Sequence, residues 1–293
     1  MRISVILWNR GDAAPLKRCI ASLLAVKDGE QLEIIAATHP PISPHDFAAA
    51  ANVRIVDVAE PANHAVLRAR AMATATGDWF FFTEPYCTFP ENFVQLLQRA
   101  AQDDADIVGG GVAVASATSA FAWATAIFEF APFMAPCGDA EEVGVTTNNV
   151  LIRRSLLDPV DQWQQDGFWK FFFLESARQR GTRITQQPER IVMHHPPYRF
   201  AMFLRRTYHH GRAFAAMRTR TQSFVPRFLR ALCFPAVPLV MCTRALRTCW
   251  RRPALRSRAL LLSPHLLGIY VAWALGEALG LVAGPGRSIG EVY

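Results

Sequence analysis

Residues 77–87 read GDWFFFTEPYC, a run of large apolar side chains that ends on a single carboxylate, Glu84. A short continuous apolar run bounded by turn residues is typical of a strand that is buried on both faces. We therefore predict a strand at Trp79–Thr83 that presents Glu84 at its carboxyl end. Pro85 and Tyr86 follow, so this carboxylate has no second acid beside it.

Apolar runs alternate with helical patterns on both sides of this stretch. The predicted strands are Arg2–Trp8, Leu32–Ala36, Val53–Val58, Asp106–Val108, Val150–Ile152 and Ile191–Met193. The predicted helices are Ala13–Val26, Ala65–Thr76, Glu91–Ala101, Gly167–Arg180 and Arg199–Met217, and residues 116–147 are predicted to be irregular. Strands that alternate with helices favour the α/β class, with a mostly parallel sheet covered on both faces.

Polar side chains fall where the predicted strands end. In open α/β sheets, ligands bind beyond the carboxyl ends of the strands. We therefore expect a single pocket to collect the residues at these ends, which are Asn9, Arg10, Thr38, Asp57 and Glu84.

The charge of the chain, formally +7, is unevenly distributed. No Asp or Glu occurs between Glu189 and Glu277, where arginines recur between strongly apolar runs. Nucleic acid and an anionic membrane are the two partners that a basic segment favours, and the apolar content favours the membrane and argues against nucleic acid. We therefore predict a domain over residues 1–198 and a basic, apolar, helical tail over residues 199–293.

The tail is predicted to lie on a membrane as a peripheral or monotopic element. His265–Ala283 is nearly long enough to span a bilayer, but Glu277 and three glycines make a span costly. An in-plane or re-entrant hairpin, formed by Phe228–Leu246 with Leu260–Ala283, fits better. The flanking arginines favour the cytoplasmic face of the inner membrane. Six cysteines without CxxC or metal-ligand spacing, and the lack of a signal-peptide pattern, fit reduced thiols in the cytosol.

Several stretches, in order along the chain, resemble the family 2 glycosyltransferases, which have the GT-A fold. They are SVILWNRGDAAPLKRCIASLL, LRARAMATATGDWFFFTEPYC, DADIVGGGV, TTNNVLIRRSLL and GTRITQQPERIVMHH. The closing segments YHHGRAFAAMR and ALGEALGLVAGPG resemble the helical tail of membrane-associated members. The resemblance covers nearly the whole chain.

The resemblance implies transfer of a sugar from a nucleotide-sugar donor to an acceptor hydroxyl, here on a lipid-linked or surface glycan. Such enzymes usually neutralise the diphosphate leaving group with a divalent cation, Mn²⁺ or Mg²⁺, held by an Asp-x-Asp motif. They also need a carboxylate that takes the acceptor's proton. The residues expected to bind the nucleotide sugar are Asn9, Arg10, Asp57, Arg68 and Glu84.

The chain departs from the family pattern at both chemical motifs. The metal motif falls on Glu84-Pro85-Tyr86, and the carboxylate that is the family's catalytic base falls near Trp169-Lys170, where the equivalent residue is Lys170. One hypothesis is a reduced metal site in which Glu84 and His194 or His195 hold the cation and Asp166 or Glu175 is the base. A second is a degenerate domain that acts as a binding partner in glycan assembly without turnover. A third is a non-enzymatic membrane-surface protein whose basic tail is the active part.

Overall fold

The chain forms two compact units. The computed structural model describes residues 1–42, 50–115, 119–135, 144–196 and 199–292. One unit contains Met1–Ala115 and Pro132–His195, and the other contains Ser116–Ala131 and Pro196–Tyr293. The boundary predicted after residue 198 lies outside the described residues. No pattern in the sequence indicated that a segment near residue 120 belongs with the C-terminal helices.

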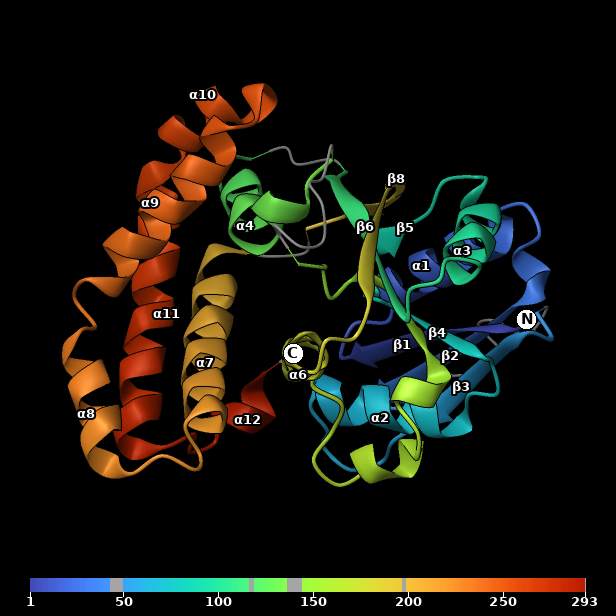
Figure 1. Cartoon of the computed structure of the whole chain (residues 1–293), viewed down its shortest axis with the longest axis horizontal. Coiled ribbons are helices and arrows are strands. Elements are labelled where there is room, and N and C mark those ends of the chain that lie inside the picture. The colour runs from blue at the N-terminus through green and yellow to red at the C-terminus, as the bar shows by residue number, and fades with distance from the viewer. Residues whose placement is uncertain (43–49, 116–118, 136–143, 197–198, 293) are drawn as a thin grey trace. The chain divides into compact units, whose positions relative to one another are not determined.

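The first unit is built on a mixed sheet that has eight strands in the described residues, in the order β3-β2-β1-β4-β7-β6-β8-β5 (Figure 1). β1, β2, β3 and β4 are mutually parallel, β7 is antiparallel to β4 and β6, and β8 is parallel to β6 and antiparallel to β5. The strands are β1 (Ile3–Arg10), β2 (Leu32–His39), β3 (Val53–Asp57), β4 (Trp79–Thr83), β5 (Cys87–Thr88), β6 (Ile107–Val114), β7 (Asn149–Arg153) and β8 (Ile184–His194). The predicted α/β class is confirmed.

Four described α-helices belong to this unit: α1 (Ala14–Ala25), α2 (His64–Thr74), α3 (Phe93–Ala101) and α6 (Lys170–Gln179). Short 3₁₀ turns occur at Gly29–Gln31, Arg154–Leu156 and Val160–Trp163, and another, Ala131–Phe133, joins the two units in sequence. α2 packs against β1 and β2, and the Asn63 side chain caps it by accepting from the backbone N–H groups of Ala65 and Val66.

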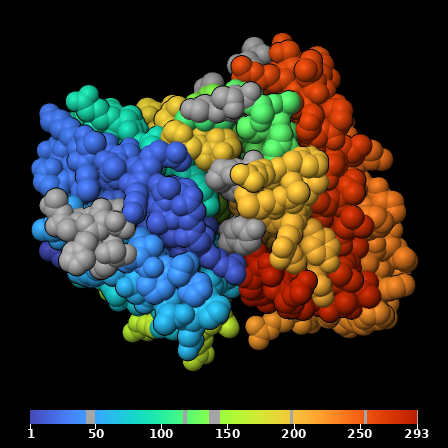
Figure 2. Space-filling view, turned by 180° about the vertical axis from the view of Figure 1, so that it is seen from behind, coloured from blue at the N-terminus to red at the C-terminus, as the bar shows by residue number. Residues whose placement is uncertain are grey.

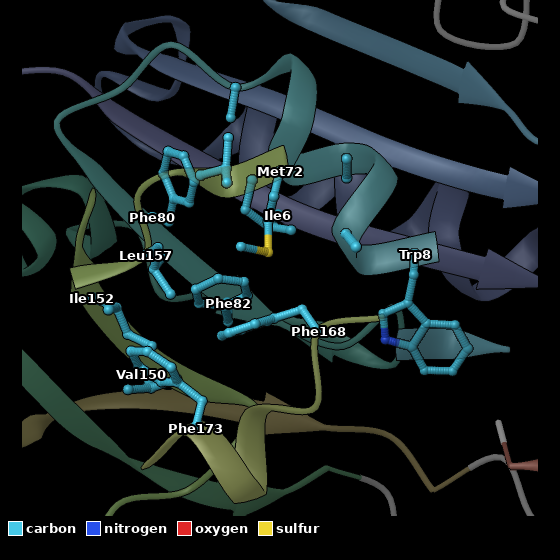
Figure 3. Packing of buried hydrophobic residues seen from close by; sticks show 14 of the residues in the cluster. Ile6, Trp8, Met72, Phe80, Phe82, Val150, Ile152, Leu157, Phe168 and Phe173 are labelled. Atoms are coloured by element: carbon cyan, nitrogen blue, oxygen red, sulfur yellow. The ribbon is translucent and has the colours of Figure 1, made fainter. Parts of the chain in front are cut away.

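The continuous apolar run of β4 is explained by burial on both faces of the sheet. Successive side chains of a strand point to opposite faces. Phe82 packs on Phe168, with ring centroids 5.1 Å apart, whereas Phe81 packs on Phe93 of α3 at 5.3 Å. Figure 3 shows Phe82 and Phe168 inside the cluster that joins β1, α2, β4 and β7. Packing in this cluster fixes the position of the end of β4, and Glu84 is the next residue along the chain.

The second unit is helical in its described part. Its helices are α4 (Ala120–Phe130), α7 (Phe200–Arg218), α8 (Phe224–Leu232), α9 (Val237–Trp250), α10 (Pro253–Leu261), α11 (Ser263–Ala283) and α12 (Ser288–Glu291). α7 and α11 lie side by side (Figure 1) and make the most extensive helix contact of the unit. Three glycines allow their backbones to approach: Gly211, Gly276 and Gly280.

α4 corrects the prediction that residues 116–147 are irregular. Its N-terminus is capped by Ser119, whose hydroxyl accepts from the N–H of Ala122 at 3.1 Å. The helix is apolar nearly all round, so its sequence shows no helical period. The remainder of the predicted irregular segment includes residues 136–143, which lie outside the described residues.

Alanine substitutions at two glycines of α11 are expected to change stability in opposite directions. A Cβ at Gly276 would clash with the Tyr208 carbonyl oxygen of α7, whereas a Cβ at Gly268 would meet no atom within 4 Å. Gly276→Ala should therefore lower stability by about 1–3 kcal/mol. Gly268→Ala should raise it by up to about 1 kcal/mol, because alanine is the better helix former. Thermal denaturation of both variants beside the natural chain measures the two shifts. Equal effects at the two positions would contradict close α7–α11 contact.

Candidate active site

A row of polar residues lies at the carboxyl edge of the parallel strands, as the sequence predicts. Asn9 of β1 pairs in register with Thr38 of β2, and Thr38 pairs with Asp57 of β3. The Thr38 hydroxyl donates to Asp57 Oδ1 at 3.1 Å, and the buried Asn9 donates to the Gly11 carbonyl at 3.3 Å. Arg10 ends β1 and is half-buried. These side chains form one edge of the sheet, and their role in nucleotide binding stays a prediction.

Glu84 lies just beyond β4 and is held by two buried cations. Lys170 Nζ donates to Glu84 Oε1 at 3.0 Å, and Arg68 Nη2 lies 3.7 Å from the same oxygen. The side chains of Arg68 and Lys170 are 2% and 3% exposed, against 18% for Glu84. We call these three residues the Glu84 cluster.

Three separate elements position the Glu84 cluster. Arg68 comes from the middle of α2 and also donates to the Phe168 carbonyl at 2.8 Å. Lys170 is the first residue of α6 and also donates to the Thr147 carbonyl, just before β7. The antiparallel pairing of β7 with β4, with Asn149 opposite Thr83, brings that carbonyl to the end of β4.

The electrostatics of the cluster follow from burial and from its unequal charges. Burial, followed by the charge of Arg68, lowers the pKa of Lys170 to about 8, although Glu84 acts in the opposite direction. Burial likewise lowers the pKa of Arg68 to about 10, against a raising effect of Glu84. Desolvation disfavours a charged form, and an opposite charge favours it. Arg68 and Lys170 both contact the Glu84 carboxylate, so two buried positive charges face one negative charge among the described residues.

Donor groups around the cluster lack acceptors among the described residues. The buried atoms Arg68 Nε, Asn148 Nδ2 and Trp8 Nε1 have no hydrogen-bond partner there. Asn148 is adjacent to Thr147, and its own Oδ1 accepts from the Thr146 hydroxyl at 2.6 Å. Trp8 belongs to an aromatic row with His64 and Trp169, with ring centroids 5.6 Å and 5.3 Å apart. A buried donor without an acceptor is costly, so such groups mark a place where an acceptor binds.

The predicted metal ligands come from two strand ends, Glu84 from beyond β4 and His194 and His195 from the end of β8. Within the described ranges, no group of three or more His, Cys, Asp or Glu residues could hold a metal ion. His195 Nε2 is paired with the Thr88 hydroxyl at 3.0 Å, and His194 packs edge-on against Tyr86, with ring centroids 6.2 Å apart. That Glu84 binds a cation together with His194 or His195 stays a prediction.

The predicted bases do not join the cluster either. Asp166 and Glu175 are both exposed, and neither has an ion pair with a described residue of the cluster. Lys170 instead occupies the buried start of α6. The sequence identified Lys170 as the equivalent of the family's catalytic base but not as the partner of Glu84. A usable signal was present in the sequence, because Lys170 is one of only three lysines in a chain rich in arginine.

The residues present do not fit a divalent cation at Glu84. Tyr86, at the position of the second acid of the metal motif, is a poor ligand for a hard cation while its phenol is neutral. The Glu84 carboxylate is already engaged by two cationic groups, which would repel a third.

Comparisons with known proteins agree with this architecture. The family model described as "Glycosyl transferase family 2" matches residues 3–161. Among solved structures, the chain is similar to "Mannosyltransferase PcManGT from Pyrobaculum calidifontis in complex with GDP-Man and Mn2+", with 16% sequence identity and a TM-score of 0.51. The match covers 98% of this chain and 86% of that one, and at this identity it shows the GT-A fold. No curated protein sequence matches the chain.

Proposed function

Because this chain belongs to glycosyl transferase family 2, and is thus a glycosyltransferase, we propose that it transfers a sugar from a nucleotide sugar to a lipid-linked or surface glycan at a membrane. The observation that carries the donor half of this proposal is the Glu84 cluster. It places an arginine and a lysine beside buried donor groups that lack acceptors among the described residues. A diphosphate supplies both the negative charge and the acceptor oxygens that such a site requires.

In the proposed reaction the bond between the sugar's anomeric carbon and the diphosphate oxygen breaks. A bond forms between that carbon and the acceptor oxygen, the acceptor's proton passes to a base, and the nucleoside diphosphate leaves. Arg68 and Lys170 would stabilise the charge that develops on the leaving group. Asp166 and Glu175 remain the predicted bases.

The acceptor half of the proposal rests on the second unit. Ser263–Ala283 is long and apolar enough to cross a membrane, and α8 and α9, bent by 68°, pass the same test as a pair. A buried core helix has the same length and composition, so the stronger support is the exposed face of α8. Five large apolar side chains are exposed there: Phe224, Val225, Phe228, Leu229 and Leu232. Figure 2 shows the orange side chains of α8 at the surface of this unit.

The positive charge of α8 and its surroundings favours an anionic membrane as the partner of this apolar face. Arg227 and Arg230 lie on α8, and acids are missing from the sequence between Glu189 and Glu277. An amphipathic helix with basic residues on its polar face binds anionic lipid in the plane of the interface. We therefore place the enzyme as a peripheral or monotopic protein on the cytoplasmic face of the inner membrane, where lipid-linked acceptors would be presented.

Incubation with UDP-, GDP-, CDP- and dTDP-sugars and a membrane lipid extract tests the proposed function. We expect release of one nucleoside diphosphate that depends on the extract, together with a lipid whose mass has increased by one sugar residue. Chromatography of the nucleotides and mass spectrometry of the lipids measure the two products. Binding of a donor without any transfer would support the alternative of a degenerate binding partner. Neither binding nor transfer would reject the proposal.

A further inference from the structure

The diphosphate of a nucleotide sugar needs positive charge when it leaves, and a bound divalent cation commonly supplies it. In this chain the carboxylate in the position to hold such a cation contacts Lys170 Nζ at 3.0 Å and Arg68 Nη2 at 3.7 Å. The described residues also offer no group of three ligands elsewhere. Two side chains of the protein, Lys170 and Arg68, thus carry positive charge at this site.

The position of Lys170 gives a second reason. Lys170 is the first residue of α6, where the partial positive charge of the helix terminus disfavours a cation. Burial of its side chain adds to that cost. A lysine held there in spite of both penalties requires anions around it. Glu84 is one such anion, but Arg68 draws on the same carboxylate oxygen.

Hydrogen-bond donors of the site remain available for a ligand. An ammonium group has three donors, and the described acceptors of Lys170 are Glu84 Oε1 and the Thr147 carbonyl. Arg68 Nε and Asn148 Nδ2 are buried donors without an acceptor among the described residues. These donors suit phosphate oxygens and do not suit a metal ion. One acceptor, Asn149 Oδ1 of β7, is also buried without a partner among the described residues.

We propose that this enzyme binds the diphosphate of its donor without a divalent cation, using the Lys170 ammonium and the Arg68 guanidinium in the metal's place. Glu84 is then a positioning residue that holds Lys170 at the end of β4, and it is not a metal ligand. This inference rests on the proposed function, because it names the means by which the same site binds the same donor. The Mn²⁺ in the complex of the similar mannosyltransferase belongs to that protein.

Calorimetric titration of the full chain with UDP, GDP, CDP and dTDP, each in EDTA and in Mn²⁺, tests the proposal. We expect one of the four to bind with dissociation constants that agree within about twofold in the two buffers. Lys170→Met should weaken that binding at least tenfold in EDTA, because it removes one charge and one donor. Lys170→Arg, which keeps the charge, should retain most of the affinity.

The exposed Lys27 provides the matched control. Lys27→Met removes the same charge from the same chain and should leave the dissociation constant unchanged. Circular dichroism of each variant verifies that it is folded.

The outcomes separate this inference from the proposed function. Binding that requires Mn²⁺ and is lost in Glu84→Gln would overturn the metal-free site and leave the sugar transferase intact. Binding in EDTA that Lys170→Met does not weaken would remove Lys170 from the site. If none of the four nucleotides binds in either buffer, both proposals fail.

Discussion

Replacing Glu84 by glutamine is expected to destabilise the first unit by about 3–5 kcal/mol. The substitution keeps the size of the side chain but removes the carboxylate that Lys170 and Arg68 share. Both cations are almost fully buried, so each would be left without a described counter-charge. A buried charge that loses its partner is still desolvated, but no electrostatic attraction offsets the free energy of that desolvation.

Urea denaturation followed by tryptophan fluorescence measures the loss, and an exposed ion pair of the same unit gives the control. Arg153 Nε lies 2.8 Å from Asp106 Oδ1, but these side chains are 38% and 37% exposed. Asp106→Asn should therefore cost no more than about 1 kcal/mol. A similar small cost for Glu84→Gln would show that Glu84 does not compensate the two cations.

A double variant identifies the pair responsible. Combining Glu84→Gln with Lys170→Met removes both charges of the 3.0 Å contact, so part of the stability lost in Glu84→Gln should return. We expect a coupling energy of about 1–3 kcal/mol between the two positions. Strict additivity would mean that Lys170 does not depend on Glu84.

The sequence predicted the sheet well where burial alone decides the structure. β4 has the bounds that were predicted. A strand packed on both faces is a continuous apolar run, so its ends are marked clearly by the first polar residues on either side. β6 and β8 are longer than predicted, because three glycines in the middle of β6 and the polar residues 185–190 in the middle of β8 interrupt the apolar pattern. α4 was missed because a helix surrounded by apolar side chains loses the periodic signal on which a helix prediction depends.

The site was predictable to the extent that topology determines it. Asn9, Thr38 and Asp57 fall on one edge because the carboxyl ends of neighbouring parallel strands must meet there. The ion pair between Glu84 and Lys170 joins residues that are 86 positions apart, and it depends on how α6 packs beside β7. No local pattern encodes that packing. The sequence could therefore identify both residues as unusual without showing that they form a pair.

The same limit applies to the predicted metal ligands. His194 and Glu84 both follow or end a predicted strand, which made a shared pocket plausible from sequence. In the structure, β5 pairs with the end of β8, which places Cys87 opposite His194. The Thr88 hydroxyl and His195 Nε2 form a hydrogen bond with each other. The two-residue strand β5 is too short to leave a pattern, so the sequence could not reveal what the histidines contact.

Replacing three apolar residues of α8 by serine is expected to weaken binding to anionic vesicles by about 100-fold. Phe224, Phe228 and Leu232 are 55%, 43% and 61% exposed and recur every fourth residue, so they lie on one side of the helix. About half of each side chain is available to lipid, which corresponds to roughly 1 kcal/mol per residue and about 3 kcal/mol together. A factor of ten in affinity corresponds to about 1.4 kcal/mol, which gives the expected change.

Sedimentation with vesicles of phosphatidylglycerol and phosphatidylcholine measures this loss, and Leu24→Ser is the matched control. Leu24 is a 37% exposed leucine of α1, in the first unit, and its replacement should leave vesicle binding unchanged. Because none of the three α8 residues is buried, the triple variant should keep the thermal stability of the natural chain. Undiminished binding by the triple variant would show that α8 is not the membrane contact. Binding that is lost equally to neutral and anionic vesicles would assign the contact to the apolar face alone, whereas the arginines of α8 predict that phosphatidylglycerol strengthens it.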